Sequence, residues 1–555
     1  MKRLFGILLI FALAAGCGKT DPSGNEGGGG STVPKDWTIS GTVSGNDGHL
    51  LKDVVVSDGL NCVKTNDEGR YFLPADIAST EYVFVSTPSE YGASVKDGHA
   101  CFWKFLKDCT KESDGKYVID FTLEKNTTPE RFTIFIYGDP QPRPSSASLD
   151  KVAYSSLACC TDMYRDMKEY AATLKGRKVY GIGLGDIVHQ ALSLLTQYKK
   201  GMATTGITTY NVIGNHDQGH VLEQSDEDAS KSFVSQMGPV NYSFNLGGMH
   251  FLMLDDMIAL GPGSGKYSDE CSTGLTDAIW QWVQNDMALV PFTTPIMVCA
   301  HSPMMRTESG SDRSGQHLGD LRNLLSRYTK VYAWAGHTHT TFNYVNTANP
   351  VIETHTVTRV TGALWINDYL GSNGTPRGYI VFDYDNGTVS WKFKPTYYQT
   401  AEYIGTYGNP TSGQKPEYTW RDWDYVDGKA VLKSNGKPLD DSYQMQVFPP
   451  GTYGDKGYVY ANIFLWDELW KMPVFTVNGE PSVMKRVTEK DFRYSYSYWD
   501  LFSFYNKNKN IGSEFAPDKN NNSSMFRVYV GDEHGSGTVS VKDRFGNTHT
   551  SSIIW

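Results

Sequence analysis

Five short apolar segments, each followed by Gly or Ala and then by polar residues, constrain the fold of this chain more than any other feature. The segments cover residues 133–137, 179–184, 208–213, 296–299 and 331–334. Helical patterns over 149–174 and 191–200 separate the first three, and an apolar helical stripe over 275–287 precedes the fourth. Strands that alternate with helices predict a parallel or mixed sheet covered on both faces. Open sheets of this kind bind ligands beyond the carboxyl ends of their strands, so the polar residues there form the candidate site.

The polar residues after these segments are of the types that bind metal ions. Asp139 and Gln141 follow the first segment, Asp186 the second, Asn215, His216 and Asp217 the third, His301 the fourth, and His337 and His339 the fifth. Mixed oxygen and imidazole ligands suit Mn, Fe or Zn, and one carboxylate can bridge two ions. A single His after a strand is more often a hydrogen-bonded polar residue than a ligand. Two imidazoles at positions i and i+2, however, point the same way on extended backbone. All five groups in this order therefore indicate a metal centre.

In these five groups the sequence resembles the calcineurin-like metallophosphoesterase superfamily, over residues 130–395. The resemblance implies an α/β core, built as a two-sheet sandwich flanked by helices, and two divalent metal ions. It assigns the first ion to Asp139, Gln141, Asp186 and His339. It assigns the second ion to Asp186, Asn215, His301 and His337, with Asp186 bridging the two. His216 would lie beside the leaving-group oxygen, as a proton donor or a stabiliser of the transition state.

Two positions depart from the family pattern. The first group usually reads Asp-x-His, and here Gln141 takes the place of the imidazole. An amide oxygen is a weaker and harder donor, so we expect the first site to bind its ion loosely and to favour Mn²⁺ over Zn²⁺. His189 stands where protein-phosphatase members carry the Asp that orients the catalytic histidine. Asp217 is a candidate for that orienting role, or else caps the turn that follows.

Four further residues near these groups are weaker candidates. Asp255 and Asp256 follow an apolar segment over 251–254, and either support the metal ligands or are solvated charges at a strand exit. Arg143 and Arg306 either clamp a phosphate group or are solvated surface residues.

All-β patterns flank the core segment, which we place at 127–396. Over 36–126, short alternating runs separated by Gly, Asn and Asp turns predict a β-sandwich. This segment resembles the transthyretin-like, carboxypeptidase-regulatory type of module. Residues 397–555 are rich in Tyr, Trp, Asn and Gly and predict a C-terminal all-β domain. We expect structural roles for both modules, although the C-terminal aromatic residues could instead shape the entrance of the site or bind glycan.

The N-terminus predicts export and lipid attachment. Two basic residues precede an apolar run over 4–15, which is too short for a membrane helix but suits a signal peptide. Residues 14–17 read Ala-Ala-Gly-Cys and resemble a bacterial lipobox; the alternative is an ordinary secretory signal. We therefore place a lipoprotein signal peptide at 1–17, with lipidation at Cys17, and a flexible Gly-rich linker at 18–35. This predicts a lipid-anchored protein of the bacterial cell envelope, in contact with the membrane only through Cys17.

The predicted function is that of an envelope-anchored dinuclear-metal phosphoesterase. It would hydrolyse phosphate esters by attack of a metal-activated hydroxide, on scavenged substrates such as phosphosugars, phosphoglycans or similar phosphorylated small molecules. The alternative is a nucleoside-diphosphate or phospholipid head-group phosphodiesterase. An alternative of another class is a glycan-binding envelope protein with a degenerate metal site. The net charge of −10 excludes a general affinity for nucleic acid.

Overall fold

The computed structural model describes most of the chain from Asp36 onward. The described residues are 36–144, 156–219, 225–260, 271–307, 310–362, 371, 373–396, 423–426, 429–432, 441–448, 450, 457–487, 524–531 and 534–555. The signal peptide, Cys17 and the linker lie outside the described residues and stay predictions. None of the helices in the described part is both long enough and apolar enough to cross a membrane.

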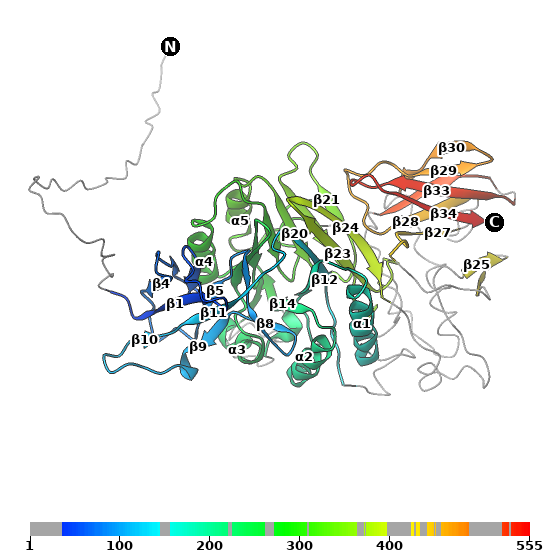
Figure 1. The fold of residues 1–555 in the computed structure, drawn as a ribbon. Helices are drawn as coiled ribbons and strands as arrows, with labels where there is room; N and C mark the ends of the chain where they lie inside the picture. Colours follow the sequence, from blue (N-terminus) through cyan, green and yellow to red (C-terminus); the bar gives the residue numbers. More distant parts are fainter. Residues whose placement is uncertain are drawn as a thin grey trace, which may run out of the picture. The chain divides into compact units, whose positions relative to one another are not determined.

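A seven-stranded mixed sheet carries the first three groups of candidate residues (Figure 1). Its order is β24-β23-β12-β13-β14-β8-β7. The strands are β7 (Ser94–Lys96), β8 (His99–Cys101), β12 (Arg131–Tyr137), β13 (Lys178–Leu184), β14 (Thr208–Val212), β23 (Gly378–Asp385) and β24 (Thr388–Pro395). β12, β13 and β14 are parallel, with Tyr137 opposite Gly183 and Leu184 opposite Val212. Because these strands end level with one another, the residues that follow them share one edge of the sheet.

A six-stranded mixed sheet, in the order β15-β16-β19-β20-β22-β21, carries the other two groups. The strands are β15 (Tyr242–Leu246), β16 (Met249–Met253), β19 (Ile296–Cys299), β20 (Val331–Ala335), β21 (Asn343–Val345) and β22 (Ile352–Thr356). β16, β19, β20 and β22 are parallel, and Cys299 lies opposite Trp334. Ile134 of the first sheet shares one buried apolar cluster with Phe251 and Val298 of the second. The predicted α/β core is confirmed, and its two sheets pack as a sandwich.

Helices flank the two sheets. They are α1 (Ser156–Ala171), α2 (Leu195–Ala203), α3 (Asp226–Met237), α4 (Asp277–Met287) and α5 (Leu318–Leu325). α1 and α2 lie beside the seven-stranded sheet in Figure 1, and they bury Met163 and Met202 in a second apolar cluster that includes Phe135. They overlap the helical patterns predicted over 149–174 and 191–200, but α1 ends three residues earlier than predicted, and α2 begins four residues later and ends three residues later.

The cap of α4 shortens the apolar stripe that the sequence indicated. The side chain of Thr276 accepts a hydrogen bond from the N–H of Ile279 at 3.3 Å, which is a typical start for a helix. Trp282 and Met287 then face the core. Leu275 is buried but precedes the cap, so it is not part of the helical stripe.

Residues before β12 form two further sheets, β10-β1-β11-β6 with β4 beside β1, and β3-β2-β5-β9. The strands are β1 (Ile39–Gly45), β2 (Val55–Ser57), β3 (Cys62–Lys64), β4 (Arg70–Leu73), β5 (Tyr82–Ser86), β6 (Tyr91–Gly92), β9 (Trp103–Phe105), β10 (Tyr117–Val118) and β11 (Phe121–Lys125). Val43 and Val56 belong to their shared core. β7 and β8 come from the same stretch but join the seven-stranded sheet, where His99 pairs with Thr209. The transthyretin-like assignment and the limits 36–126 stay predictions.

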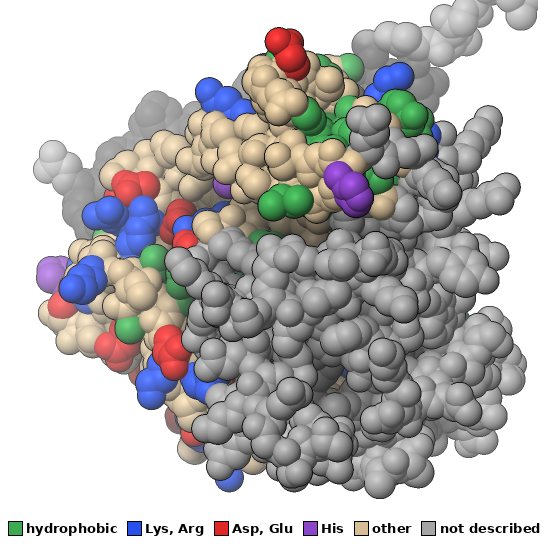
Figure 2. All heavy atoms as spheres, turned by 90° about the vertical axis from the view of Figure 1, so that its right-hand side faces the viewer, with side chains coloured by type: hydrophobic (Ala, Val, Ile, Leu, Met, Phe, Trp, Pro, Cys, Tyr) green, Lys and Arg blue, Asp and Glu red, His purple; other side chains and the backbone are tan. Residues whose placement is uncertain are grey.

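After β24 the described regular elements are strands. They are β25 (Trp423–Val426), β26 (Lys429–Leu432), β27 (Met445–Phe448), β28 (Tyr458–Ile463), β29 (Val474–Val477), β30 (Glu480–Val483), β31 (Lys485–Arg486), β32 (Met525–Tyr529), β33 (Ser536–Lys542) and β34 (Thr548–Ile554). They form the sheets β27-β28-β32-β31 and β30-β29-β33-β34 and the hairpin β25-β26. On the face shown in Figure 2, described acidic and basic side chains are interspersed rather than gathered by charge. The all-β character of 397–555 as a whole stays a prediction, because much of that stretch lies outside the described residues.

A buried ionic group links the C-terminal strands to the core. Glu353 in β22 is fully buried. Both of its carboxylate oxygens accept from the Arg544 guanidinium, at 2.6 and 2.7 Å. Arg544 also donates to Asp467 at 3.0 Å, and Lys330 pairs with the same glutamate. The described C-terminal strands are therefore tied to the six-stranded sheet through a desolvated ion cluster.

Candidate metal centre

The backbone is left-handed at most of the candidate ligands. The φ angle is 53° at Asp139, 40° at Gln141, 50° at Asp186, 64° at His337 and 58° at His339. This conformation costs an L-residue about 1–2 kcal/mol, and such strained positions gather at functional sites, where the surrounding structure enforces them. The extended backbone expected for the two histidines is wrong: both lie in the bend that follows β20.

Glycine precedes the ligands because neighbouring loops approach too closely for any side chain. A Cβ atom on Gly185 would lie 2.5 Å from Nδ1 of His301. A Cβ atom on Gly336 would lie 2.5 Å from Oδ2 of Asp139. Both contacts are shorter than real Cβ atoms allow, so glycine lets ligands from different strands meet.

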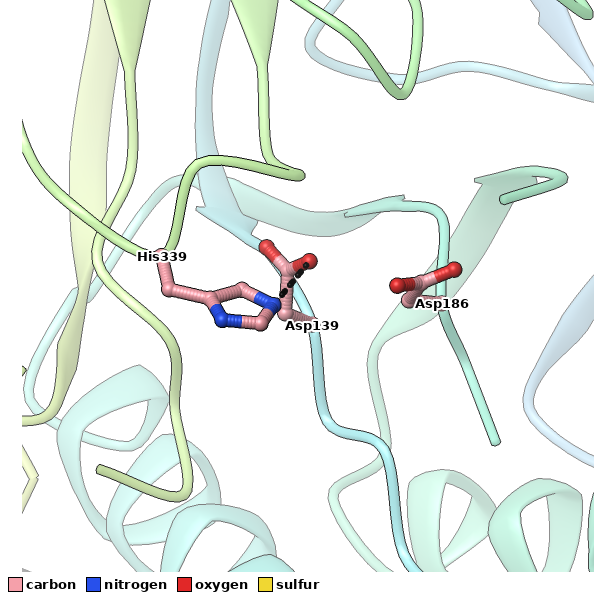
Figure 3. Close-up of side chains that lie close together, drawn as sticks. All are labelled: Asp139, Asp186 and His339. Atoms are coloured by element: carbon pink, nitrogen blue, oxygen red, sulfur yellow. Dashed lines mark ion pairs between the residues drawn. The ribbon is translucent and has the colours of Figure 1, made fainter. Parts of the chain in front are cut away.

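Three ligand-type side chains converge at the first predicted ion position. Asp139, Asp186 and His339 each offer one atom, and these atoms lie within 4.8 Å of one another. Nε2 of His339 faces Oδ1 of Asp139 at 3.3 Å, while Asp186 approaches from the loop after β13 (Figure 3). The backbone N–H of His337 donates to both carboxylate oxygens of Asp139 at 3.1 Å. These bonds fix the orientation of the Asp139 carboxylate.

Gln141 joins this group through Asp186. Its Nε2 donates to Oδ2 of Asp186 at 2.5 Å, and the whole side chain is buried. Its Oε1 has no hydrogen-bond partner among the described residues. A buried acceptor left without a partner costs about 1–3 kcal/mol, a cost that a bound cation would remove. The residues at this position therefore fit a divalent ion.

The second predicted ion position is built around His301. Its Nδ1–H donates to the carbonyl of Leu184 at 2.7 Å, so Nε2 is the ring atom available to a metal. That Nε2 lies 3.2 Å from Oδ1 of Asn215, 3.3 Å from Oδ1 of Asp186 and 3.2 Å from Nδ1 of His337. Lone-pair atoms this close to one another call for a positive charge between them. This set also fits a divalent ion.

The pKa values of the site reflect the same demand for positive charge. Burial alone would lower the pKa of His301, but the carboxylates of Asp186 and Asp139 raise it to about 10. Burial, followed by the charge on His301, lowers the pKa of His337 to about 4. Burial opposes ionisation of Asp186, but His301 and His216 outweigh it and lower the pKa of that carboxyl. Either a proton on His301 or a metal cation provides the charge that the carboxylates require.

Asp217 holds the loops of two candidate ligands together. Its Oδ2 accepts from the N–H groups of Ile187 and Gly214, both at 2.9 Å, and its Oδ1 accepts from Val188 at 2.8 Å. These bonds tie the loop after β13 to the turn η3 (Asn215–Asp217). The carboxylate thus caps the turn that ends at Asp217, rather than the following turn that the sequence suggested, and its role towards His216 stays a prediction.

Asp256 supports the histidine of the fourth group. Its Oδ1 accepts from the N–H of His301 at 3.0 Å and from that of Ser302 at 3.1 Å. Asp255 accepts from the N–H of Met257 at 3.1 Å. Both carboxylates are buried, so neither is a solvated charge. Asp256 therefore positions a candidate ligand, whereas Asp255 shapes its own turn.

His216 lies next to the shared carboxylate. Its backbone N–H donates to Oδ1 of Asp186 at 2.9 Å, and its ring packs on that of His189, with centroids 4.2 Å apart. Burial, together with the charges of His216 and Arg359, lowers the pKa of His189 to about 3. His189 is therefore neutral at physiological pH.

The two arginines near the motifs are not solvated surface residues. Arg306 pairs with Asp312 at 2.7 Å and lies 4.9 Å from the ring centre of Tyr344. Arg143 is buried, and its backbone N–H donates to the hydroxyl of Ser156 at 3.2 Å. Arg306 is thus engaged within its own loop, and a phosphate-clamping role for Arg143 stays a prediction.

Sequence reasoning missed Arg359, which lies behind the first ion position. It is fully buried, and its guanidinium donates to the carbonyls of Gln141 and Gly362 at 3.5 and 3.4 Å. Gly138 and Arg359 form an isolated parallel β-bridge, so the segment after β22 contacts the loop that carries Asp139 and Gln141. Burial lowers the pKa of Arg359 to about 10, which leaves it charged near pH 7. The sequence of β22 has no apolar run that would have marked it as a buried strand. The only signal for Arg359 was its position among Val and Thr residues.

Comparison with protein families matches two segments of the chain. Residues 37–126 match the N-terminal part of the calcineurin-like phosphoesterases, and residues 354–549 match their C-terminal part. Together the two matches span more than half of the 555 residues. The chain belongs to the calcineurin-like phosphoesterases. All five strand-end groups lie between the two matched segments, so they support the same assignment independently. This phosphoesterase is a metal-dependent hydrolase.

Similar solved structures share little sequence with this phosphoesterase. A dimetal phosphatase from Danio rerio is 12% identical, with 48% of this chain and 96% of that chain covered and a TM-score of 0.34. A purple acid phosphatase from Lupinus luteus is 13% identical, with 62% and 67% covered and a TM-score of 0.33. A putative 5'-nucleotidase from Staphylococcus aureus is 10% identical, with 76% and 90% covered and a TM-score of 0.33. No curated protein matches the chain.

Proposed function

We propose that this phosphoesterase works with a dinuclear metal centre. Asp139, Gln141, Asp186 and His339 would hold one divalent ion, and Asp186, Asn215, His301 and His337 the other. The convergence of lone-pair atoms on Nε2 of His301 carries the proposal. The Oε1 of Gln141, without a partner among the described residues, supports it. We expect Mn²⁺ rather than Zn²⁺ beside Gln141, because an amide oxygen is a hard donor.

The side chains around the two ions have distinct chemical roles. When bound, the ions would lower the pKa of a water molecule and offset negative charge on the phosphoryl oxygens. Asp186 supplies negative charge to both positions. The imidazole of His216 gives a proton to the leaving-group oxygen or stabilises the charge that develops there. The carboxylates of Asp217 and Asp256 keep the ligand loops in place by accepting hydrogen bonds from backbone N–H groups of those loops.

Metal content and turnover of two ligand variants test the centre. In Asp186→Asn and His337→Ala, metal per chain should fall and turnover of p-nitrophenyl phosphate should drop about 100-fold or more. His317→Ala is the matched control, because His317 pairs with Asp277 and Asp320 at the start of α5. Wild-type turnover in either folded ligand variant would contradict the dinuclear assignment.

We infer that the substrates are phosphorylated small molecules or glycans, with phosphosugars and phosphoglycans favoured. Predicted export from the cytoplasm supports scavenged substrates of this kind. A panel of phosphosugars, nucleoside diphosphates and phospholipid head-group diesters decides between them, with p-nitrophenyl and bis-p-nitrophenyl phosphate as monoester and diester standards. Preference for a nucleotide or a head-group diester would favour the alternative phosphodiesterase function. Glycan binding without metal-dependent turnover would favour the binding protein with a degenerate site.

We propose that Cys17 anchors the protein in the bacterial cell envelope. The apolar run over 4–15 and the lipobox-like residues that follow it support this. Cys17→Ser expressed in a bacterial host should leave the membrane fraction and lack a lipid. Unchanged fractionation of this variant would point to an ordinary secretory signal or to another mode of attachment.

A further inference from the structure

A second histidine ring packs against the proposed proton donor. The ring centroids of His189 and His216 are 4.2 Å apart, and their planes are inclined by 41°. Aromatic pairs usually have centroids about 4.5–7 Å apart, so this contact is tight. Both side chains are partly buried. The contact therefore removes part of the rotational freedom of the His216 side chain.

The backbone beside the ring pair is fixed as well. The N–H of His189 donates to the carbonyl of Pro142 at 3.1 Å, and the N–H of Gln190 donates to the carbonyl of His216 at 2.9 Å. Gln190 adopts a left-handed φ of 55° to make that turn. These bonds hold the loop after β13 against the turn that carries His216. Neither histidine of the pair belongs to the proposed ligand sets.

We propose that His189 is a positioning residue whose ring aligns the His216 imidazole with the leaving-group oxygen. This rests on the proposed function of His216 and adds a residue to it. In that step, the bond from phosphorus to the oxygen of the attacking hydroxide forms and the bond to the leaving oxygen breaks. The leaving oxygen takes a proton from His216, and His189 exchanges none. Alignment of this kind matters most when the leaving group is a poor one, because a poor leaving group depends most on protonation.

The test compares two leaving groups in full-length protein supplied with Mn²⁺. His189→Ala should lower kcat for phenyl phosphate roughly tenfold or more, with a much smaller loss for p-nitrophenyl phosphate. KM and metal content should stay as in the wild type. His189→Phe keeps an aromatic ring at the position and should retain most of the turnover of phenyl phosphate.

A double-variant cycle shows whether His189 acts through His216. If it does, the double variant His189→Ala/His216→Ala should turn over phenyl phosphate no more slowly than His216→Ala alone. His317→Ala again serves as the control and should match the wild type on both substrates. Additive losses in the cycle would show that His189 acts independently and would overturn the proposal.

The remaining outcomes are equally distinct. Equal losses on the two phosphates, loss of metal from His189→Ala, no loss at all, or a Phe variant as slow as the Ala variant would each overturn the positioning role. Failure of the proposed function has another signature. In that case the wild type would show no metal-dependent turnover of either phosphate, or His216→Ala would keep the wild-type dependence on leaving group.

Discussion

Gln141 replaces an imidazole at the first ion position, which leaves that position with one histidine where the second has two. Gln141→His should supply a stronger nitrogen donor, raise metal content per chain and reduce the need for added Mn²⁺. Gln141→Ala removes both the proposed metal ligand, Oε1, and the hydrogen bond from Nε2 to Asp186. The metal content of this variant should therefore fall below that of the wild type. Metal analysis, with rate measured against added Mn²⁺, checks both variants.

The control for this pair is Gln316→Ala, which alters a glutamine that hydrogen-bonds Asp277 instead. Its metal content should equal that of the wild type. If the wild type and both Gln141 variants have the same metal content per chain and the same dependence of rate on added Mn²⁺, Gln141 is not a ligand. Its orphan acceptor would then need another explanation.

Single residues were predictable where chemistry and position coincide. His301 and Asp186 stand directly after apolar strands, and residue type together with strand-end position was enough to bring them into one hypothesis. The left-handed backbone at His337 was not predictable, because it depends on which loops surround it rather than on its neighbours in sequence. Arg359 was missed for a related reason: its burial results from the contact with Gly138, a residue far away along the chain.

At the scale of single elements, β8 places a buried histidine, His99, in the seven-stranded sheet. Burial lowers the pKa of His99 to about 4, and its hydrogen bond to the Asp97 carbonyl opposes that shift only in part. The unfolded chain takes up a proton near the ordinary value of about 6.5. The contribution of neutral His99 to the free energy of unfolding is therefore fully present above about pH 6.5. It is lost as pH falls towards the pKa of about 4 that His99 has in the folded protein.

The free energy of unfolding should therefore drop through His99 by about 2 kcal/mol between about pH 8 and about pH 5. His99→Phe cannot take up this proton and should lack that part of the pH dependence. Denaturant unfolding at the two pH values measures the difference. Identical pH dependence in His99→Phe and the wild type would show that His99 does not contribute.

Elements were predictable where their apolar pattern is local. β19 occupies the predicted segment, and β13 and β14 differ from theirs by one residue at one end. The placement of β7 and β8 was not predictable, because their sequence resembles that of the neighbouring N-terminal strands. Which sheet they join is decided by a pairing with Thr209, more than a hundred residues later. No local pattern encodes such a contact.

For the molecule as a whole, the Glu353–Arg544 pair links distant parts of the chain. Arg544→Ala should lower the free energy of unfolding by about 3 kcal/mol, because it leaves a buried carboxylate with only part of its positive partners. Pairing it with Glu353→Gln should recover part of that loss. Lys52→Ala, in an exposed pair with Asp67, should have no measurable effect.

Denaturant unfolding of the three variants measures these differences. If Arg544→Ala behaves like Lys52→Ala, the ionic link is not formed in solution. A lower midpoint with unchanged metal-dependent turnover would show that the link stabilises the fold without shaping the metal centre.

The placement of β8 also decides where this chain can be shortened. A protein that begins at residue 127 would contain every proposed ligand, yet it would lack the strand that pairs with β14. The outer edge of β14 would then expose unpaired backbone N–H and C=O groups, which are a template for pairing with another molecule. Such a truncated protein is expected to self-associate through that edge. The smallest soluble catalytic unit therefore begins before β7, inside the segment matched to the N-terminal part of the family.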